Sequence, residues 1–359
     1  MPPRRCSSGR ESWVSNAFAE ESGGPAVQAT GPFGLPVDPA LAADSRRFLA
    51  AVEELLLDSV RSDNPMLDEA SKHLVEAGGK RFRPMLVSLA SHFGDPNAAG
   101  LVPAAVVVEL THLGTLYHDD VMDEATVRRG RQSANVRWDN TRAILTGDYL
   151  FARASDLLAD LGTEPVRIQA RAFARLVRGQ IEETTGPAEG ADHLKHYLQV
   201  LADKTASLIA VSGQFGALLS GAPTSTVDTV TSACEKIGIA FQLSDDILDI
   251  ESETEESGKT PGTDLREGIR TLPMHHVLGG TGSGPDDARL RDLLAADLTD
   301  DALHAEALAL LRAHPAMDRA RADLHRVSED ARAELLTLPA NPARDALTAL
   351  CDYVVSRTG

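Results

Sequence analysis

Two short stretches of the sequence carry three aspartates each in the same order, D-D-x-x-D, among apolar neighbours. They are TLYHDDVMDE at 115–124 and FQLSDDILDI at 241–250. Residues three and four apart share one face of a helix, so the carboxylates of each motif converge if both stretches are helical. The six residues are Asp119, Asp120, Asp123, Asp245, Asp246 and Asp249.

Converging carboxylates repel one another, and the repulsion grows as water is excluded, so a cation should lie between them. Oxygen-only ligands suit Mg²⁺, which keeps several waters and commonly bridges protein carboxylates to a substrate phosphate. The alternative is a solvated acidic face formed by chance, which predicts roughly 0.2 matches to the pattern in this chain. The sequence holds two matches, each with apolar neighbours such as Leu116 and Ile247. It therefore predicts a magnesium site for a phosphorylated substrate.

Basic residues that could bind the other side of a phosphate cluster in four stretches near the two motifs. Two glycines begin the first stretch, GGKRFRP, and predict a break after which a helix starts and directs donors at an anion. A single basic residue is more often an ordinary surface charge, but the grouping of all four stretches around the aspartates favours binding. The residues are Lys80, Arg81, Arg83, Arg128, Arg129, Lys204 with its neighbour Thr205, and Lys259.

The elements that position these residues are predicted to be helices. Hydrophobic residues make up 43% of the 359 residues and aromatic residues only 4%, with Ala and Leu recurring throughout, which favours helices over sheets. From Asp38 onward, apolar residues recur at three- and four-residue spacing, and Gly- and Pro-rich turn signals separate the helical stretches. We therefore expect a disordered tail over 1–37 and one all-α domain over 38–359.

Charge and cysteine content exclude several classes of protein. The formal net charge is −18, which argues against a nucleic-acid-binding protein, because such proteins need a basic face. No segment reaches the roughly 18 apolar residues of a membrane span, and the N-terminal stretch lacks the apolar run of a signal peptide. The three cysteines are isolated, so neither a disulfide framework nor a zinc site is predicted, and we expect a cytoplasmic protein.

From about Leu41 to the C-terminus, the chain resembles the all-trans polyprenyl diphosphate synthases of the bacterial medium- and long-chain type. The resemblance rests on GGKRFRP, HLGTLYHDDVMDEATVRRG, LTGDYLFARA, DKTASL, GIAFQLSDDILDI and GKTPGTDLREGIRTLP, in the order and spacing of that family. It implies a single-domain antiparallel helical bundle, with the two aspartate motifs facing each other across a deep central cavity. It also implies a homodimer.

The resemblance further implies roles for individual residues. The six aspartates would hold three Mg²⁺ on the diphosphate of an allylic substrate, and Arg128 and Lys204 would complete the catalytic set. Contacts to that substrate would come from Arg128, Lys204, Thr205, Gln242 and Lys259, and the pocket for isopentenyl diphosphate from Lys80, Arg83, His112 and Arg129. His118 would either orient the Asp119 carboxylate or serve as an ordinary core histidine.

These roles imply a magnesium-dependent prenyl transfer. The allylic C–O bond ionises, the double bond of isopentenyl diphosphate attacks the cation, and loss of a proton leaves a chain one five-carbon unit longer. The apolar product leaves peripheral membrane contact open at the release step.

Product length depends on how far the growing chain runs into the core. Helical side chains lean toward the N-terminus, so residues one and two turns before Asp119 line the start of that path. Short-chain members of the family carry a bulky aromatic residue there, whereas this chain has Thr111, Gly114 and Thr115. The open path predicts a product longer than C15, in the range C30 to C50. The alternative is that the small residues merely let two helices pack closely, with a floor supplied by a residue such as Phe151 or Leu157.

One position departs from the family pattern. In LREGIRTLP the family usually has lysine where this chain has Ile269, and Arg270 does not directly replace it, because one residue along a helix turns a side chain by about 100°. We expect one cation fewer on the allylic diphosphate.

Three other functions remain alternatives to long-chain elongation. The first is synthesis of geranylgeranyl (C20) diphosphate. The second is a class I terpene cyclase, which the complete DDILD and GGKRFRP motifs disfavour. The third is a non-catalytic partner subunit, which the presence of all six aspartates disfavours.

Overall fold

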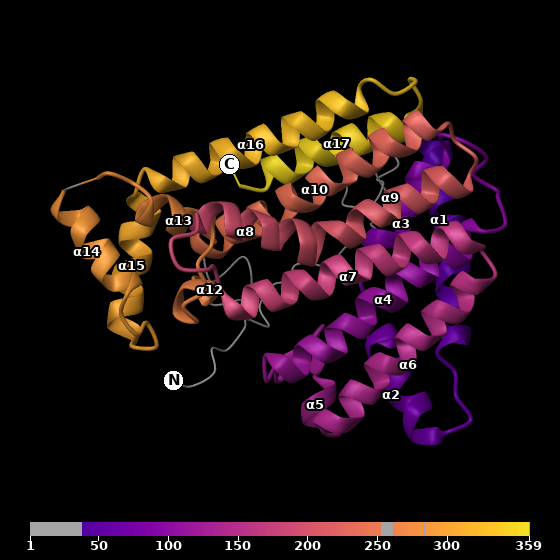
Figure 1. Ribbon diagram of the computed structural model, residues 1–359, viewed down its shortest axis with the longest axis horizontal. Coiled ribbons are helices and arrows are strands. Elements are labelled where there is room, and N and C mark those ends of the chain that lie inside the picture. Colours follow the sequence, from indigo (N-terminus) through magenta and orange to yellow (C-terminus); the bar gives the residue numbers. More distant parts are fainter. Residues whose placement is uncertain (1–37, 253–260, 283, 359) are drawn as a thin grey trace, which may run out of the picture.

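Helices make up almost every element of the structure, a computed structural model that describes residues 38–252, 261–282 and 284–358 (Figure 1). The first half of the chain contains α1 (Pro39–Ser59), α2 (Pro65–Glu76), α3 (Phe82–Ser91), α4 (Leu101–Met122), α5 (Ala134–Arg137), α6 (Asn140–Ala159) and α7 (Thr163–Thr185). The second half contains α8 (His193–Leu201), a π-helical turn (Ala202–Ala206), α9 (Ser207–Leu219), α10 (Thr224–Glu251), α12 (Thr263–Arg266), α13 (Leu272–Leu278), α14 (Pro285–Leu294), α15 (Asp301–Ala313), α16 (Ala316–Leu335) and α17 (Pro342–Ser356). A short hairpin of β1 (Val127–Arg128) and antiparallel β2 (Arg131–Gln132) follows the first aspartate motif.

Local sequence signals set several of the helix starts. Asp38 caps α1, where its carboxylate accepts hydrogen bonds from backbone N–H groups of the first turn, and Pro39 occupies the first helical position. Asn64 and Pro65 play the same two parts at α2. A side-chain oxygen at the cap satisfies donors that the helix leaves unpaired, and the fixed φ of proline suits the first turn.

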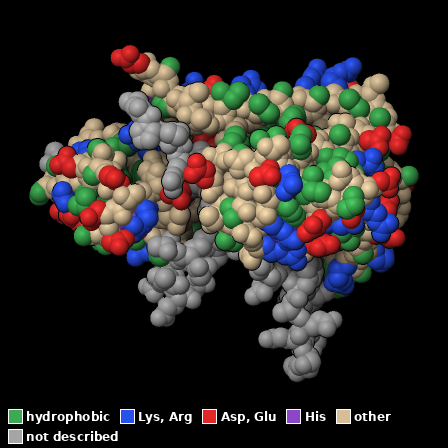
Figure 2. Space-filling model, turned by 90° about the horizontal axis from the view of Figure 1, so that it is seen from below, with side chains coloured by type: hydrophobic (Ala, Val, Ile, Leu, Met, Phe, Trp, Pro, Cys, Tyr) green, Lys and Arg blue, Asp and Glu red, His purple; other side chains and the backbone are tan. Residues whose placement is uncertain are grey.

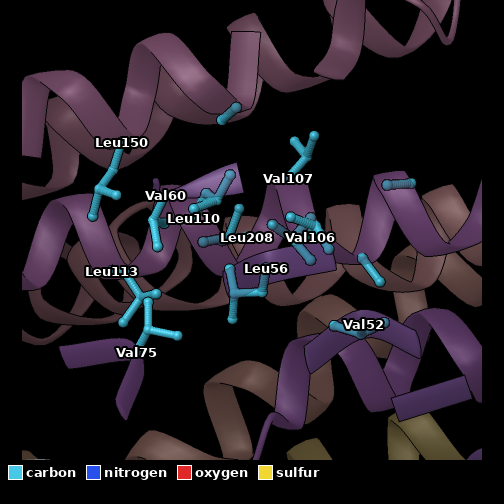
Figure 3. Close-up of a cluster of buried hydrophobic side chains, with 14 of the residues drawn as sticks. Val52, Leu56, Val60, Val75, Val106, Val107, Leu110, Leu113, Leu150 and Leu208 are labelled. Carbon is cyan, nitrogen blue, oxygen red and sulfur yellow. The ribbon is translucent and has the colours of Figure 1, made fainter. Parts of the chain in front are cut away.

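The central helix is α4, which carries the first aspartate motif at its C-terminal end. Its residues are buried without a break from 104 to 114, and it packs against α1, α3, α6 and α9. A helix surrounded on all sides must be apolar on all sides, which explains the run LVPAAVVVEL. Figure 3 shows Val107, Leu110 and Leu113 of α4 in one cluster with Leu150 of α6 and Leu56 of α1.

The second aspartate motif ends a longer helix, α10, which packs against α9 and α16. α16 and α17 lie along α10, and α14 and α15 stand at one end of the molecule beyond α13 (Figure 1). Leu243 and Ile247 of α10, both fully buried, belong to a hydrophobic cluster with α13 and α16. Both motifs therefore stand at helix ends whose preceding turns are anchored in apolar cores.

The prediction of an all-helical bundle is confirmed. The hairpin at 127–132 is an exception that the sequence analysis did not anticipate. The expected tail over 1–37 lies outside the described residues, so the domain limits stay a prediction. Over the part of the chain that the structure describes, no helix is long and apolar enough to cross a membrane. On the face in Figure 2, acidic and basic side chains are interspersed among hydrophobic ones.

Candidate active site

The first aspartate motif occupies the end of α4, with Asp123 as the residue that closes the helix. Asp120 is fully buried, and its Oδ1 accepts a 2.7 Å hydrogen bond from Nε of Arg128, which is itself 5% exposed. Asp119 and Asp123 are half-buried. The hairpin after α4 brings Arg128 back to the helix, so Asp120 is committed to a pair within the protein.

The remaining carboxylates of this motif crowd one another. Burial and the neighbouring Asp119 carboxylate raise the pKa of Asp123 to about 7, whereas the positive charges of Lys204 and Arg128 lower it. Glu183, on α7, adds to the negative charge at this point. The crowding that the sequence predicted is therefore present, and an added cation would favour the ionised form of Asp123.

The second motif repeats the division between one buried and two more accessible carboxylates. Asp246 is fully buried and accepts hydrogen bonds from the hydroxyl of Tyr197, from the Gln242 side-chain amide at 3.3 Å and from the backbone N–H of Leu272 at 3.4 Å. Asp245 is half-buried and accepts a 2.5 Å bond from Nη2 of Arg357 near the C-terminus. In each motif, then, the middle aspartate is held inside the protein.

The last aspartate of the second motif lies against a helix start. The backbone N–H groups of Thr263 and Asp264, in the first turn of α12, donate to the two carboxylate oxygens of Asp249 at 3.1 Å each. Burial and the Asp264 carboxylate nevertheless raise the pKa of Asp249 to about 7. In both motifs, therefore, burial and neighbouring carboxylates outweigh the nearby positive charges and raise the pKa of the last aspartate. Among the described residues, no group of three or more His, Cys, Asp or Glu side chains is arranged to hold a metal ion by itself.

The predicted pocket for isopentenyl diphosphate gathers around His112. Burial lowers the pKa of this histidine well below its usual range, and the positive charges of Arg83, Arg129, Arg128 and Arg81 lower it further. The ring is therefore neutral and can accept or donate a hydrogen bond. The structure brings together three of the four residues predicted for this pocket: Arg83, His112 and Arg129.

The fourth predicted residue, Lys80, links the pocket to the second motif. Burial and the charge of Arg357 lower the pKa of Lys80, and the Asp245 carboxylate raises it. Arg81, in contrast, is buried and committed to Glu53 and Glu109, with its Nη1 2.8 Å from Glu109 Oε1. GGKRFRP therefore supplies one structural arginine and two basic side chains that approach the site.

The glycines of GGKRFRP permit a close packing contact. Nη1 of Arg129 donates to the backbone carbonyls of Gly78 and Leu74 at 2.5 and 3.2 Å. A Cβ added at Gly79 would lie 3.1 Å from that nitrogen, and the φ of Gly79 is +150°, a conformation that L side chains rarely adopt. Glycine at 79 thus makes room for the guanidinium in the pocket.

The residues predicted to contact the allylic substrate differ in where they lie and in what they contact. Lys204 and Thr205 stand on the π turn after α8, where Lys204 Nζ pairs with Glu183. The amide of Gln242 is bonded to Asp246 and orients that carboxylate. Lys259 lies outside the described residues.

The structure corrects the interpretation of Gly114. A Cβ at this position would lie 2.9 Å from Cε1 of Phe151 and 3.2 Å from the Gly147 carbonyl oxygen, both on α6. Gly114 therefore lets α4 and α6 cross closely, which is the alternative that the sequence left open, and Phe151 fills the space beside it. Its small size does not by itself open a path for the product.

Thr111 and Thr115 lie along the face of α4 that leads to Asp119, since each is four residues from the next. Thr115 is half-buried, whereas Thr111 is buried and its Oγ1 accepts a 2.7 Å hydrogen bond from Nε2 of Gln169 on α7. Gln169 Oε1 has no hydrogen-bond partner although it is buried. The two helices are thus bridged by a polar pair two turns below the aspartates.

Local structure bears on two further expectations. Nε2 of His118 lies 3.0 Å from the Ile144 carbonyl oxygen on α6, and the side chain is 28% exposed, so this histidine helps join α4 to α6 from a partly exposed position and is not a buried core histidine. Ile269 and Arg270 lie in the loop between α12 and α13, so the argument from a helical turn of 100° was wrong. Arg270 is exposed.

Three residues of the site were missed by sequence reasoning: Glu183, Tyr197 and Arg357. Glu183 and Tyr197 stand in ordinary helical stretches with no motif to mark them. Arg357 carried a weak signal, a single cation after the apolar run YVV near the C-terminus. Its guanidinium also lies over the Phe241 ring, 4.6 Å from the centroid.

The arrangement matches a known family. The sequence profile described as polyprenyl synthetase matches residues 64–311, a span that includes both aspartate motifs and the basic pocket. The chain belongs to the polyprenyl synthetase family. The resemblance on which the sequence analysis relied is therefore confirmed.

Individual relatives span the chain almost completely. The nonaprenyl diphosphate synthase of Mycobacterium tuberculosis is 50% identical over 90% of this chain and 96% of the relative. A geranylgeranyl pyrophosphate synthase from Corynebacterium glutamicum, in a crystal structure complexed with calcium and isoprenyl diphosphate, has a TM-score of 0.82 and 44% identity over 90% of this chain and 98% of that one. A decaprenyl diphosphate synthase from Rhodobacter capsulatus has a TM-score of 0.79 and 35% identity over 89% and 99%.

Proposed function

We propose that the protein is a Mg²⁺-dependent prenyltransferase that lengthens an allylic diphosphate by successive head-to-tail condensation with isopentenyl diphosphate. The observation that carries the proposal is that two basic side chains approach each aspartate motif. Lys204 and Arg128 act on Asp123 of the first motif, and Lys80 and Arg357 act on Asp245 of the second. Two anionic substrates and their counter-ions fit such an arrangement.

The carboxylates available to metal are the outer ones of each motif. Asp120 and Asp246 are fully buried and bonded within the protein, so we assign the metal contacts to Asp119, Asp123, Asp245 and Asp249. The raised pKa values of Asp123 and Asp249 fit a site completed by cations. Since Mg²⁺ binds through one or two carboxylates together with waters and substrate phosphates, the described protein ligands need not enclose it alone. When bound, Mg²⁺ supplies positive charge that stabilises the departing diphosphate.

Separate sets of basic side chains bind the two substrates. Lys204, Thr205 and Arg128 contact the allylic diphosphate at the first motif, and their charge favours ionisation of the allylic C–O bond. Lys80, Arg83, Arg129 and neutral His112 hold isopentenyl diphosphate, so that its double bond lies in line with the cation. Deprotonation then gives an allylic product one unit longer, with the departing diphosphate as the base.

We propose an all-trans product longer than C15, in the range C30 to C50. Small side chains at Thr115 and Thr111 leave room next to the first motif, and the bridge from Thr111 to Gln169 closes that space two turns deeper. The relatives include nonaprenyl and decaprenyl diphosphate synthases. Because a geranylgeranyl pyrophosphate synthase has a similar structure, a C20 product is the second candidate.

A homodimer completes the proposal, with apolar side chains of α6 and α7 as its interface. These residues are 41–55% exposed, which is unusual for side chains of their size, and on each helix their spacing puts them on one face. They are Ile144, Leu145, Val166, Val177 and Ile181. Leu145→Asp combined with Ile181→Asp should give a monomer by light scattering, and an unchanged mass would remove this surface from the interface.

Consumption of isopentenyl diphosphate by the purified chain tests the proposed reaction. We expect turnover with Mg²⁺ and an allylic primer, loss of turnover with a chelator, and loss in Asp119→Asn. Asp345→Asn serves as the matched control, because that aspartate is 68% exposed and its carboxylate pairs with the adjacent Arg344 on α17. A chain that cyclises the allylic substrate without isopentenyl diphosphate would contradict the proposal. The cytoplasmic location stays a prediction from the sequence.

A further inference from the structure

Lys204 and Thr205 stand on the π turn Ala202–Ala206 between α8 and α9. A π turn holds more residues than an α-helical turn, so it rotates the side chains it carries relative to the flanking helices, and such turns frequently occur at functional sites. Lys204 Nζ pairs with Glu183, and its charge acts on Asp123. The turn therefore determines where this amine meets the first aspartate motif.

α7 packs directly against the backbone of the π turn. In Figure 1, α7 runs beside α8 and α9, which the turn connects. A Cβ added at Gly179 would lie 2.5 Å from the backbone nitrogen of Lys204 and 2.9 Å from its Cα. Because the backbones of Gly179 and Lys204 are already this close, the position of the turn against α7 determines the position of Lys204.

One arginine of α7 holds the turn from the same face of the helix. Arg175 lies one turn before Gly179, and its Nε donates to Oδ1 of Asp203 at 2.8 Å. Its Nη2 donates to Oε1 of Glu235 on α10 at 2.6 Å and to the Ala202 carbonyl at 3.4 Å. A single guanidinium thus ties two residues of the turn to α7 and α10.

Arg175 is the nearest cationic partner of the Asp203 carboxylate. The Asp203 side chain is only 7% exposed, so an unpaired carboxylate there would be costly. Nε of Arg178 also lies 3.4 Å from Asp203 Oδ2, but that arginine is 59% exposed, compared with 31% for Arg175. Without Arg175, the carboxylate keeps only a partner that water screens, and the turn loses its link to α10.

We propose that Arg175, acting through Asp203, is a positioning residue that fixes the π turn and so directs Lys204 and Thr205 at the allylic diphosphate. The inference rests on the proposed function for the identity of that ligand. Arg175 acts on the turn and leaves the pocket for isopentenyl diphosphate undisturbed, so its loss should affect the two substrates unequally.

Steady-state kinetics with a C15 allylic primer and isopentenyl diphosphate test this inequality. In Arg175→Gln, we expect the KM for the allylic primer to rise roughly tenfold, the scale seen when a partner that orients a ligand is lost. The KM for isopentenyl diphosphate should stay close to that of the wild type. Arg175→Lys keeps a positive charge near Asp203 and should recover much of the loss. Arg171→Gln, an exposed arginine one turn earlier on α7, is the matched control and should behave as wild type.

Binding of inorganic pyrophosphate in the presence of Mg²⁺, measured by calorimetry, separates the positioning role from the reaction. Arg175→Gln should bind pyrophosphate roughly tenfold more weakly. Adding Asp203→Asn should cause no further loss, because residues of one ion pair act non-additively. Unchanged binding and unchanged allylic KM in Arg175→Gln would overturn the inference. So would an equal rise in both KM values together with a lower melting temperature. A wild-type chain that binds pyrophosphate, loses it in Arg175→Gln and yet elongates no primer would sink the proposed function alone.

Discussion

Substitution by asparagine should affect different properties of the protein at the two adjacent aspartates of the first motif. Asp120→Asn removes the charge from a fully buried carboxylate that is bonded to Arg128. Asp119→Asn removes the charge from a half-buried carboxylate that repels Asp123. We therefore expect the first change to lower the stability of the fold and the second to lower activity with little effect on stability.

The magnitude follows from the burial of the pair. The side chains of Arg128 and Asp120 are 6% and 0% exposed, so Asp120→Asn removes the carboxylate charge that lies 2.7 Å from a buried guanidinium. Breaking a buried ion pair costs about 3–5 kcal/mol, and the retained amide oxygen places this case near 3 kcal/mol. With an unfolding entropy of about 2.1 cal/mol/K per residue, a chain of this length shifts by roughly 1.4 °C per kcal/mol, so the melting temperature should fall by about 4 °C. Asp119→Asn loses a like-charge neighbour instead, and its free energy of unfolding should stay within about 1 kcal/mol of the wild type.

Two assays on the same preparations decide the question. Thermal and urea unfolding without Mg²⁺ give the stabilities, and incorporation of isopentenyl diphosphate at saturating Mg²⁺ gives the activities. Loss of a metal contact that is worth several kcal/mol should lower the rate of Asp119→Asn by about 10³-fold. The reasoning fails if Asp120→Asn melts at the wild-type temperature, or if Asp119→Asn loses as much stability as Asp120→Asn.

Three further changes test other parts of the site. Gln169→Ala removes the bridge to Thr111 and should lengthen the product by at least one five-carbon unit in mass spectrometry, whereas an unchanged product would place the floor elsewhere. Gly79→Ala crowds the Arg129 guanidinium and should raise the KM for isopentenyl diphosphate without raising that for the allylic primer; equal effects on both would count against the assigned pocket. Burial, and after it the charge of Arg270, lowers the pKa of His275 to about 4, whereas its value in the unfolded chain is about 6.5. Between these two values the unfolded chain binds more protons than the folded one. The free energy of unfolding should therefore rise from pH 4 to pH 6.5, by about 3 kcal/mol at most. His275→Gln should flatten that part of the stability profile, and a wild-type profile that is already flat would refute the assignment.

The helical fold and the reacting groups could be predicted because their signals are local. Spacings of three and four residues place both D-D-x-x-D motifs on helices, and α4 and α10 carry them as expected. The basic pocket could be anticipated because its residues lie in compact stretches such as GGKRFRP. These features depend on a few neighbouring residues and on helix geometry alone.

The distinctions within the site depend on contacts between distant segments, and the sequence does not contain them. Asp119 and Asp120 are equivalent in the pattern, and only the return of the hairpin to α4 commits Asp120 to Arg128. Arg357 meets Asp245 across 112 positions of the chain. Gly114 was misread because a small residue in an apolar helix has the same signature whether it lines a cavity or, as here, contacts Phe151.

The products formed by the purified wild-type chain are the most direct test of prenyl transfer at this site. The protein is incubated with Mg²⁺, isopentenyl diphosphate and, in separate reactions, C5, C10, C15 and C20 allylic primers, and the products are sized by mass spectrometry. We expect a ladder of all-trans products that extends beyond C15 and is absent without Mg²⁺. If no primer were extended by even one five-carbon unit in the presence of Mg²⁺, the assignment of prenyl transfer to this site would be contradicted.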